Sequence, residues 1–194
     1  MIYVYHKKMN KVWYCAAVHD TKIVATYFSV KEPDLNRLLR KLPQEVRFQV
    51  LDEPNEPLTE VMAALEEIFK GKDKEDYDLK MAFDRLSSYA RKVLNCTRLV
   101  PVGYVTTYSA IAKVAGRIAR SVGRVEASNL FPLLIPCHRV VCSDLTIGGY
   151  GYGEQVKMEI LQREDRGYEE SRTLQVDGGL LSVFPANRVK QRVS

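Results

Sequence analysis

The segment Leu134-Ile135-Pro136-Cys137-His138-Arg139-Val140-Val141 places a thiol and an imidazole side by side after an apolar run that ends in proline. A free thiol is mostly protonated at neutral pH, with a reference pKa of roughly 8.5, so a nucleophilic cysteine needs a base or a positive charge beside it. Pro136 favours an extended Ile135, and the apolar residues 130–135 favour burial. The pair is therefore predicted to emerge from the interior at a fixed place. In isolation, such a tripeptide favours a structural cysteine and a surface histidine instead.

Length and composition suit one domain or two small ones, with 194 residues of which 46% are hydrophobic. The longest nearly unbroken apolar run, residues 130–135, is far shorter than the roughly 20 residues that span a membrane. The amino terminus carries no secretory pattern. We therefore expect an intracellular protein, cytoplasmic or, in a eukaryote, nuclear, without a membrane segment.

Four cysteines, Cys15, Cys96, Cys137 and Cys142, are too few for a disulfide scaffold and suit a reducing compartment. Pairing of Cys137 with Cys142 under oxidation stays open. The candidate zinc ligands of the first half are His6, Cys15 and His19. On one strand, Cys15 and His19 would lie about 13 Å apart at roughly 3.3 Å per residue, and no fourth ligand is evident. We expect no metal.

The net charge of +5 is unevenly distributed along the chain. Residues 1–78 contain 12 Lys and Arg against 14 Asp and Glu, whereas residues 79–194 contain 17 against 10. The excess positive charge therefore lies in the half that holds Cys137. Neutralising phosphates with Lys and Arg is the main source of nonspecific affinity for nucleic acid, so this half suits DNA binding. A solvated basic face is the alternative that the counts leave open.

The first half is predicted to combine strands and helices. Residues 2–5, 12–18, 23–28 and 47–51 are rich in β-branched and aromatic residues, and Asp20-Thr21 suits a hairpin turn. One helix is expected after Pro33, and a second over 58–69. The charged stretch 70–78 is the predicted linker. The boundaries that follow are 1–78 for an α/β domain, 79–170 for a second domain and 171–194 for a carboxyl-terminal extension.

In the second half, a helix is expected over 86–96, and two short helices follow it. Thr107 is predicted to cap a helix over 108–114 that ends at Gly116, and another helix runs from about Ile118 to Ala127. Two helices joined by a tight glycine turn form a helix-turn-helix. The second helix carries Arg117, Arg120 and Arg124 at i, i+3 and i+7 among small residues, including Gly123, which suits close approach to a DNA groove. A solvated arginine face is the alternative from this helix alone.

Two later segments complete the candidate site. The run Ile147-Gly148-Gly149-Tyr150-Gly151-Tyr152-Gly153 lacks the pattern of a nucleoside-triphosphate loop and suits a pocket wall. A helix from about Glu154 then puts Lys157, Leu161 and Glu164 on one face. A hairpin is expected around Asp177-Gly178-Gly179. The basic residues beyond it, Arg188, Lys190 and Arg192, are expected to form a disordered tail rather than a DNA contact.

These motifs, in their order and spacing, resemble the O6-alkylguanine-DNA alkyltransferase family over roughly residues 83–167. The specific core is Pro136-Cys137-His138-Arg139-Val140, preceded by Tyr108, Arg120 and Asn129 and followed by the glycine-rich run, Lys157 and Glu164. The resemblance implies a ribonuclease H-like amino-terminal domain in front of a winged helix-turn-helix domain, an α/β (α+β) chain overall. It also implies a monomer that binds double-stranded DNA containing O6-alkylguanine and needs no cofactor.

The resemblance also implies a role for each site residue. Cys137 is the nucleophile, and His138 is its base. Because neighbours on a regular strand point to opposite faces, either the backbone departs from strand geometry here or a water carries the proton, and the family implies the water. Glu164 orients the imidazole. Arg120 fills the space of an everted base, and Tyr108 helps turn the phosphate and offers its hydroxyl to the guanine. Asn129 holds the turn before the cysteine, with a helix C-cap as the alternative. The base is held by stacking on Tyr150, by the backbone of Val140 and Gly151, and by contacts of Lys157.

Three positions depart from the family pattern. Leu130 stands where proline is common, Gly151 stands where many relatives have serine, and Glu126 occupies a helix position expected near DNA. These differences bear on groove affinity and on the contacts of the base.

The function expected from all of this is DNA repair by irreversible, single-turnover transfer of an alkyl group from O6-alkylguanine to Cys137. The main alternative is a non-catalytic module of the same fold that binds alkylated lesions. Two further alternatives are a thiol hydrolase that uses Cys137 and His138, and a sequence-specific regulator, which would bind one operator tightly and not show a weak sequence preference.

Overall fold

The computed structural model describes residues 1–32, 35–73, 77 and 79–191, and the chain separates into two compact units. Unit 1 comprises residues 1–68, 74–85 and 130–134, and unit 2 comprises residues 69–73, 86–129 and 135–194. Secondary structure is mixed α and β in both. Within the described part of the chain, no helix is long and apolar enough to cross a membrane.

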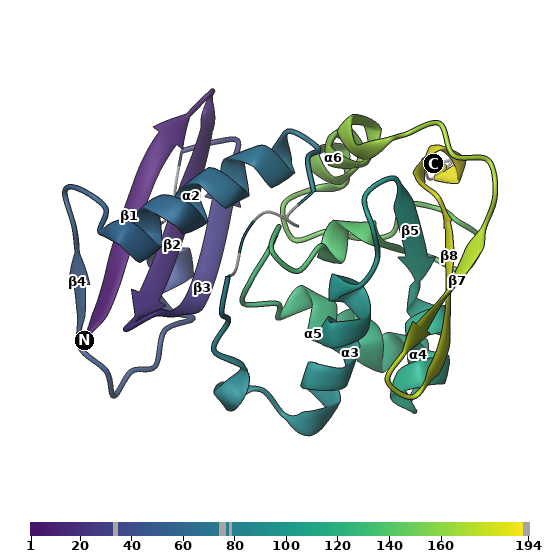
Figure 1. Cartoon of the computed structure of the whole chain (residues 1–194), viewed down its shortest axis with the longest axis horizontal. Helices are drawn as coiled ribbons and strands as arrows, with labels where there is room; N and C mark the ends of the chain where they lie inside the picture. The colour runs from purple at the N-terminus through teal and green to yellow at the C-terminus, as the bar shows by residue number, and fades with distance from the viewer. Residues whose placement is uncertain (33–34, 74–76, 78, 192–194) are drawn as a thin grey trace. The chain divides into compact units, whose positions relative to one another are not determined.

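Unit 1 is a four-stranded sheet with helix α2 lying across it (Figure 1). Its elements are β1 (Ile2–Met9), β2 (Val12–His19), β3 (Lys22–Ser29), α1 (Leu35–Leu39), β4 (Phe48–Val50), α2 (Glu56–Phe69) and the 3-10 turn η1 (Phe83–Arg85). The order is β3-β2-β1-β4, antiparallel except for the parallel pair β1–β4. The expected strands, the Asp20-Thr21 turn and the 58–69 helix are confirmed. Pro33 lies outside the described residues.

The observed division of the chain does not follow the predicted boundary at residue 78. Each unit contains segments that are distant from one another in the sequence. Met81 forms a bridge with Ile23 of β3, and the backbone amide of Thr26 donates to the carbonyl of Leu130 at 2.8 Å. Residues 79–85 and 130–134 therefore belong to unit 1. Conversely, the first part of the predicted linker belongs to unit 2, because the carbonyl of Gly71 accepts from the guanidinium of Arg166 at 2.5 Å.

Unit 2 packs helices against a second sheet, ordered β6-β5-β8-β7. Its elements are α3 (Ser88–Arg98), β5 (Tyr104–Thr107), α4 (Tyr108–Ala115), α5 (Ala119–Ala127), the 3-10 turn η2 (Cys137–Arg139), β6 (Val140–Val141), α6 (Glu154–Glu164), β7 (Arg172–Val176), β8 (Gly179–Pro185) and the 3-10 turn η3 (Ala186–Arg188). Thr107 caps α4 by accepting from the amide of Ala110, and Gly116 ends it in the left-handed region at φ 85. Both predictions for this helix are confirmed.

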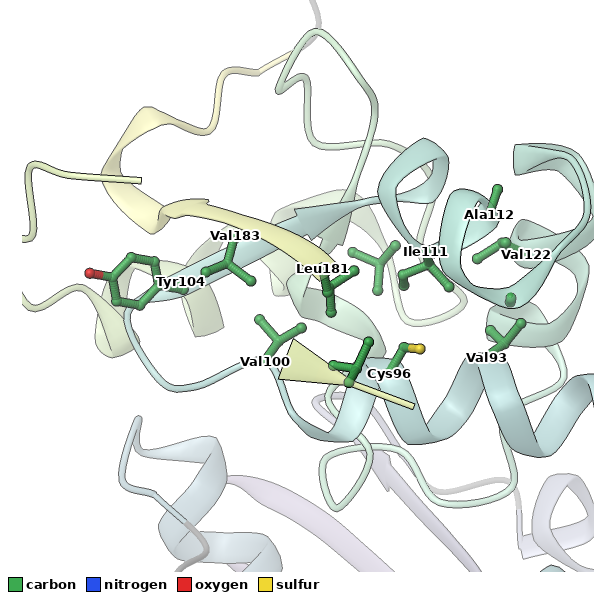
Figure 2. Packing of buried hydrophobic residues seen from close by; sticks show 12 residues of the cluster. Val93, Cys96, Val100, Tyr104, Ile111, Ala112, Val122, Leu181 and Val183 are labelled. Atoms are coloured by element: carbon green, nitrogen blue, oxygen red, sulfur yellow. The ribbon is translucent and has the colours of Figure 1, made fainter. Parts of the chain in front are cut away.

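The core of unit 2 joins three helices to the carboxyl-terminal hairpin (Figure 2). Ile111 of α4 and Val122 of α5 are fully buried together with Leu181 and Val183 of β8. Tyr104 of β5 pairs with Pro185 of β8. The described residues of the predicted extension, 171–191, are therefore not separate, because alternating apolar side chains of their hairpin complete this core.

The prediction of a disordered basic tail is wrong for the two described residues. Arg188 lies in η3, and the backbone of Lys190 pairs on both sides, donating to Leu145 and accepting from Ile147 at 2.9 Å each. Hydrogen bonding of the backbone on both sides fixes a segment that composition alone assigns to a tail. Arg192 lies outside the described residues.

Glu126 was expected beside DNA, and this is also wrong. Its side chain points into unit 2 and is only 7% exposed, because α5 turns this position toward α3. The Thr97 hydroxyl lies 2.6 Å from Glu126 Oε1, and Oε2 is buried without a hydrogen-bond partner among the described residues. Burial raises the pKa of this carboxyl to about 7, against the opposing effects of Thr97 and of the Lys157 ammonium.

A buried acid of raised pKa makes folding depend on pH. The folded state holds the proton more tightly than the unfolded chain, whose carboxyl titrates near its usual value of about 4.3. The stability that this proton gives is present below that value and is lost as the pH rises through about 7. We predict that Glu126→Met, which removes the ionisable group at similar size, flattens this loss and raises the free energy of unfolding at pH 8 relative to pH 5 by on the order of 1–3 kcal/mol. Urea unfolding of both proteins at the two pH values measures it, and equal pH dependence would contradict it.

Candidate active site

The backbone at Cys137 makes two tight turns in succession. Pro136, at φ −78 and ψ 65, adopts an inverse γ-turn in which the amide of Cys137 donates to the carbonyl of Ile135 at 2.8 Å. The 3-10 turn η2 follows at once, closed by the amide of Arg139 donating to Pro136 at 2.8 Å. In a 3-10 turn adjacent side chains point about 120° apart. Cys137 and His138 therefore do not alternate as they would on a strand.

Asn129 braces this double turn from the end of α5. Its side-chain amide donates to the carbonyl of Ile135 at 3.0 Å, the same oxygen that accepts from Cys137. The side chain of Asn129 is 5% exposed, so water competes little for this bond. The loop after α5 and the segment carrying the thiol are thus held to one another by a single buried side chain.

His138 and Glu164 form a fully buried pair. His138 Nε2 lies 2.9 Å from Glu164 Oε1, and both side chains are 0% exposed. The same carboxylate accepts two bonds from Arg139, Nε to Oε2 at 2.9 Å and Nη2 to Oε1 at 2.8 Å. Arg139 also donates through Nη1 to the carbonyl of Val100 at 2.6 Å. Every side chain of this group therefore has a charged or hydrogen-bonded partner, as buried charge requires.

Glu164 is ionised in this arrangement. Burial by itself raises the pKa of this carboxyl, but His138 and Arg139 together outweigh it and hold the pKa at about 2. An ionised carboxylate only accepts hydrogen bonds, so the proton between the pair belongs to His138 Nε2. Nδ1 then carries the free lone pair of the ring.

The basic nitrogen of His138 is therefore the one that points away from Glu164. Nδ1 is buried and has no hydrogen-bond partner among the residues that the structure describes. Burial lowers the pKa of the imidazole more than Glu164 raises it, and the charges of Arg139 and Lys157 lower it further. The ring is neutral at pH 7 and ready to accept a proton, with the carboxylate in place to stabilise the cation that results.

Helix α6 supplies a second buried charge to the same site. Lys157, 0% exposed, donates through Nζ to the carbonyl of Val140 at 2.7 Å. Burial lowers the pKa of its ammonium to about 8, although the thiols of Cys137 and Cys142 and two carboxyls, Glu126 and Glu154, favour the charged form. Lys157 and Glu164 thus bring opposite charges from one helix face to either end of the short segment 137–140.

Tyr150 closes this site over the lysine. Its ring centroid lies 5.9 Å from Lys157 Nζ and 5.3 Å from the ring centroid of Tyr152. Burial raises the pKa of the Tyr150 hydroxyl well above its usual value, and the neighbouring Cys137 sulfur adds to the effect. Gly151, next in the chain, is exposed, and a Cβ there would meet no atom within 4 Å. The space beside the α-carbon of Gly151 is therefore unfilled.

Tyr108 begins α4 and lies between two glycines. A Cβ at Gly148 would lie 3.3 Å from Tyr108 Cε2 and 3.2 Å from the Sγ atom of Cys142, and Gly148 has a left-handed φ of 66. Gly148 therefore leaves the space in which the phenol ring sits. On the other side, a Cβ at Gly123 of α5 would lie 3.9 Å from Tyr108 Cε1. The small residue that we had associated with groove approach faces this tyrosine.

The three arginines do not all lie on one helix face. Helix α5 begins at Ala119 after the N-cap Ile118, so Arg117 precedes the helix. The guanidinium of Arg117 stacks 4.6 Å over the ring of Tyr89 in α3. Arg120 and Arg124, one turn apart, are both exposed on α5. The helix therefore presents two arginines to solvent, and the third stands at the turn before it.

Sequence reasoning missed two parts of this site. Arg139 was quoted only as part of the motif, although it makes three of the bonds that fix Glu164 and η2. Glu126 and Thr97 were not placed inside the domain. The only signal in the sequence was the acid itself, set in a helix otherwise built of small and basic residues.

The candidate zinc ligands of unit 1 are spread along one hairpin. His6 lies opposite Cys15 in the register of β1 and β2, whereas His19 lies opposite Ile2 at the far end. No cluster of three or more histidine, cysteine or acidic side chains suited to a metal occurs in the described parts of the chain.

Comparison with known proteins matches this site to a family. The family model described as 6-O-methylguanine DNA methyltransferase, DNA binding domain, matches residues 88–166. The methylated-DNA–protein-cysteine methyltransferase of Methanothermobacter thermautotrophicus is 41% identical over 90 residues, covering 46% of this chain and 51% of that protein. The chain thus spans about half the length of that relative. The Methanocaldococcus vulcanius protein of the same name is 35% identical over 143 residues, covering 66% of this chain and 86% of that protein.

Solved structures agree on the fold. The crystal structure of the Mycobacterium tuberculosis O6-methylguanine methyltransferase superposes with a TM-score of 0.68 at 20% identity, covering 87% of this chain and 96% of that one. That of the O6-methylguanine-DNA methyltransferase from the archaeon Pyrococcus kodakaraensis gives 0.65 at 24% identity, covering 84% and 99%. The domain model matches this chain, and the chain is 35% identical to the M. vulcanius protein over an alignment that covers 86% of it. With the shared fold, these matches show that this chain belongs to the methylated-DNA–protein-cysteine methyltransferase family.

Proposed function

We propose that this protein repairs O6-alkylguanine in double-stranded DNA by moving the alkyl group onto Cys137, once per molecule and without a cofactor. The observation that carries the proposal is the buried Glu164–His138 pair. Nδ1 of His138 has no hydrogen-bond partner among the described residues, and His138 directly follows Cys137 in the chain. Family membership adds the substrate class. A thioether is a poor leaving group, and no group among the described residues suggests itself to regenerate the thiol, so each molecule acts once.

The transfer proceeds as a displacement at the alkyl carbon. The thiol proton of Cys137 passes through a water to His138 Nδ1, and Glu164 stabilises the imidazolium. The sulfur attacks the alkyl carbon, the carbon–O6 bond breaks, and its electron pair stays on the guanine. The Tyr108 hydroxyl donates to the guanine ring as this negative charge grows. The products are S-alkylcysteine and unmodified guanine.

The substrate base has to leave the duplex before it can react. We propose that unit 2 is a winged helix-turn-helix in which α4 and α5 form the motif and the β7–β8 hairpin the wing. Arg120, exposed on α5, takes the place of the everted nucleotide, and Tyr150 stacks on the everted base. The carbonyl of Val140 accepts a hydrogen bond from that base, and Lys157 holds this carbonyl in position by donating to it. Unit 1, an antiparallel sheet with one parallel edge strand and a covering helix, is proposed to be ribonuclease H-like.

Alkyl transfer is tested directly by mass. We predict that a duplex containing O6-methylguanine adds one methyl group to the Cys137 peptide in stoichiometric amount, and that Cys137→Ala gains none while its affinity for the duplex stays within about twofold. Peptide mass spectrometry and a DNA-binding titration measure the two. An unmodified Cys137 peptide with intact lesion binding would favour the non-catalytic module instead.

The base is tested through its carboxylate partner. We predict that Glu164→Gln slows transfer at pH 7 by at least about 10²-fold, because the imidazolium loses its counter-charge. Glu159→Gln, which changes a partly exposed acid of the same helix that pairs with Arg163, should leave the rate unchanged. Since the pKa of Glu164 is about 2 in the fold, wild type loses the stability it contributes as the pH falls from about 4.3 toward 2. Urea unfolding should show a larger acid-dependent loss in wild type than in Glu164→Gln, and equal losses in the two proteins would contradict the prediction.

DNA binding is tested through the arginines of α5. We predict that Arg120→Ala and Arg124→Ala each weaken affinity for undamaged duplex several-fold and reduce the salt slope, d log K/d log[salt], by about 1 in magnitude, because each removes one positive charge from the surface proposed to meet the polyanion. Lys31→Ala, which removes an exposed charge from unit 1, serves as the control. Titrations at several salt concentrations measure the slopes. Slopes that equal wild type in both arginine variants would place the DNA elsewhere.

A further inference from the structure

We propose that residues 189–191 form a strap that positions the wall of the transfer pocket, by holding the turn in front of the glycine-rich run. The inference rests on the proposed function and names a further positioning residue for it, Lys190, which acts through its backbone. These residues follow the hairpin that completes the core of unit 2, and the alkyl-transfer chemistry above gives them no task.

The strap lies alongside residues 145–147. Thr146 and Lys190 form a parallel bridge. The amide of Lys190 donates to the carbonyl of Leu145, and the amide of Ile147 donates to the carbonyl of Lys190, both at 2.9 Å. Both polar groups of the Lys190 backbone are therefore used, whereas its side chain is exposed. The backbone of this one residue fixes the register of the two segments.

The turn that the strap holds contains a strained residue. Its ends are joined by the amide of Cys142, which donates to the carbonyl of Thr146 at 3.0 Å. Leu145 has a left-handed φ of 62, which is unfavourable for a residue with a Cβ. Such a conformation persists only where the surrounding structure fixes it. The amide of Leu145 donates to Cys142 at 3.0 Å, and its carbonyl accepts from Lys190, so the strap holds this residue from one side.

Apolar side chains attach the same two segments to the core. Leu145 and Val189 both belong to the partly buried residues that pack against a small buried cluster. The members of that cluster come from β5, β6, α6 and η3 and are Val105, Val141, Leu161 and Ala186. Leu161 is buried on α6 between Lys157 and Glu164. The turn and the strap therefore rest on the helix that supplies the two buried charges of the site.

The turn leads directly into the pocket wall. Ile147, whose amide the strap binds and whose side chain is buried, immediately precedes Gly148. A Cβ at Gly148 would lie 3.3 Å from Tyr108 Cε2, so the backbone passes close to that ring. The other end of the run is fixed at α6, because the amide of Gly153, its N-cap, donates to the carbonyl of Tyr150 at 3.0 Å. The wall is thus held at both ends.

The composition of the wall explains why its ends matter. Four of the residues 148–153 are glycines, which lack a Cβ and adopt many backbone conformations. The run therefore has little shape of its own, and its path is set by the points that hold it. When the first point is released, Tyr150 samples more positions, and the base has to restrict them when it binds. Cys137 and the Glu164–His138 pair lie outside the run, so the strap affects how the base is held and not the transfer step.

Lys190→Pro tests the strap, and Lys190→Ala is its matched control. Proline removes the amide hydrogen that donates to Leu145, whereas alanine keeps both backbone bonds and removes only the exposed side chain. Val189, at φ −70 and ψ 129, already has the extended backbone that a following proline requires. The substitution therefore removes the hydrogen bond without straining the residue before it.

The readout is the rate of Cys137 alkylation by free O6-benzylguanine at several concentrations, which needs no DNA. We expect Lys190→Pro to raise the concentration that gives half the maximal rate by roughly threefold to tenfold, the effect of about one hydrogen bond. The maximal rate should stay within about twofold of wild type, because the hydrogen bonds of Glu164 are unchanged. Lys190→Ala should follow wild type in both quantities.

Amide hydrogen exchange tests the strap in the wild-type protein, so it also decides the case in which Lys190→Pro does not fold. The amides of Ile147 and Lys190 should both be protected, with protection factors within about threefold of each other, because one opening of the strap exposes both. In Cys137→Ala, which cannot be alkylated at this position, saturating O6-benzylguanine should raise both protection factors. If the strap favours binding of the base, the base must favour the closed strap by the same factor.

The outcomes distinguish this inference from the function on which it rests. Equal half-saturation in Lys190→Pro and wild type, or an equal rise in Lys190→Ala, would overturn the role of the strap and leave alkyl transfer intact. Unprotected amides at Ile147 and Lys190, or protection that O6-benzylguanine does not change, would also overturn it. A wild-type protein that O6-benzylguanine modifies at no concentration would overturn the proposed function and this inference with it.

Discussion

The buried carboxylate of Glu164 is the constraint on which the rest of the site depends. It has no contact with water, and three donors from His138 and Arg139 surround it. A carboxylate in such a place is tolerable only when its partners are fixed, because the loss of one leaves an uncompensated charge in the interior. The same bonds settle which nitrogen of His138 carries the proton. The tautomer of His138, the residue next to the thiol, is thus a consequence of how the carboxylate of Glu164 is hydrogen-bonded.

Arg139 gives this arrangement its rigidity. Its guanidinium binds both oxygens of Glu164 and reaches the carbonyl of Val100 at the end of α3. The planar fork of arginine permits this set of bonds, which a lysine could not reproduce. The short turn η2 is therefore held at its third residue by a charge network, and before its first by the inverse γ-turn that Asn129 braces. The thiol sits between two fixed points.

Helix α6 organises the electrostatics of the whole site. Lys157 and Glu164, two turns apart, face the segment 137–140 with opposite charges, so the imidazole lies beside the carboxylate and the ammonium binds the carbonyl of Val140. Glu126 on α5 adds a buried acid whose pKa burial raises to about 7, so it changes between neutral and negative near neutrality. Because α5 also carries the exposed Arg120 and Arg124, the helix that is proposed to meet DNA with one face buries an acid on the other.

The sequence by itself determined much of the local structure and predicted the groups that are proposed to react. Periodicity, the Thr107 cap and the Gly116 terminator identified α4 and α5, and the spacing of Lys157 and Glu164 predicted a shared helix face, because these signals act over a few residues. Only the tertiary structure decided that residues 171–191 complete a core, that Gly123 faces Tyr108 and that Glu126 points inward. Those outcomes depend on which distant segment covers a side chain, and the residue type alone does not show whether an acid such as Glu126 is exposed or buried. The direction of a pKa shift follows from that burial, so it too appeared only when the chain was folded.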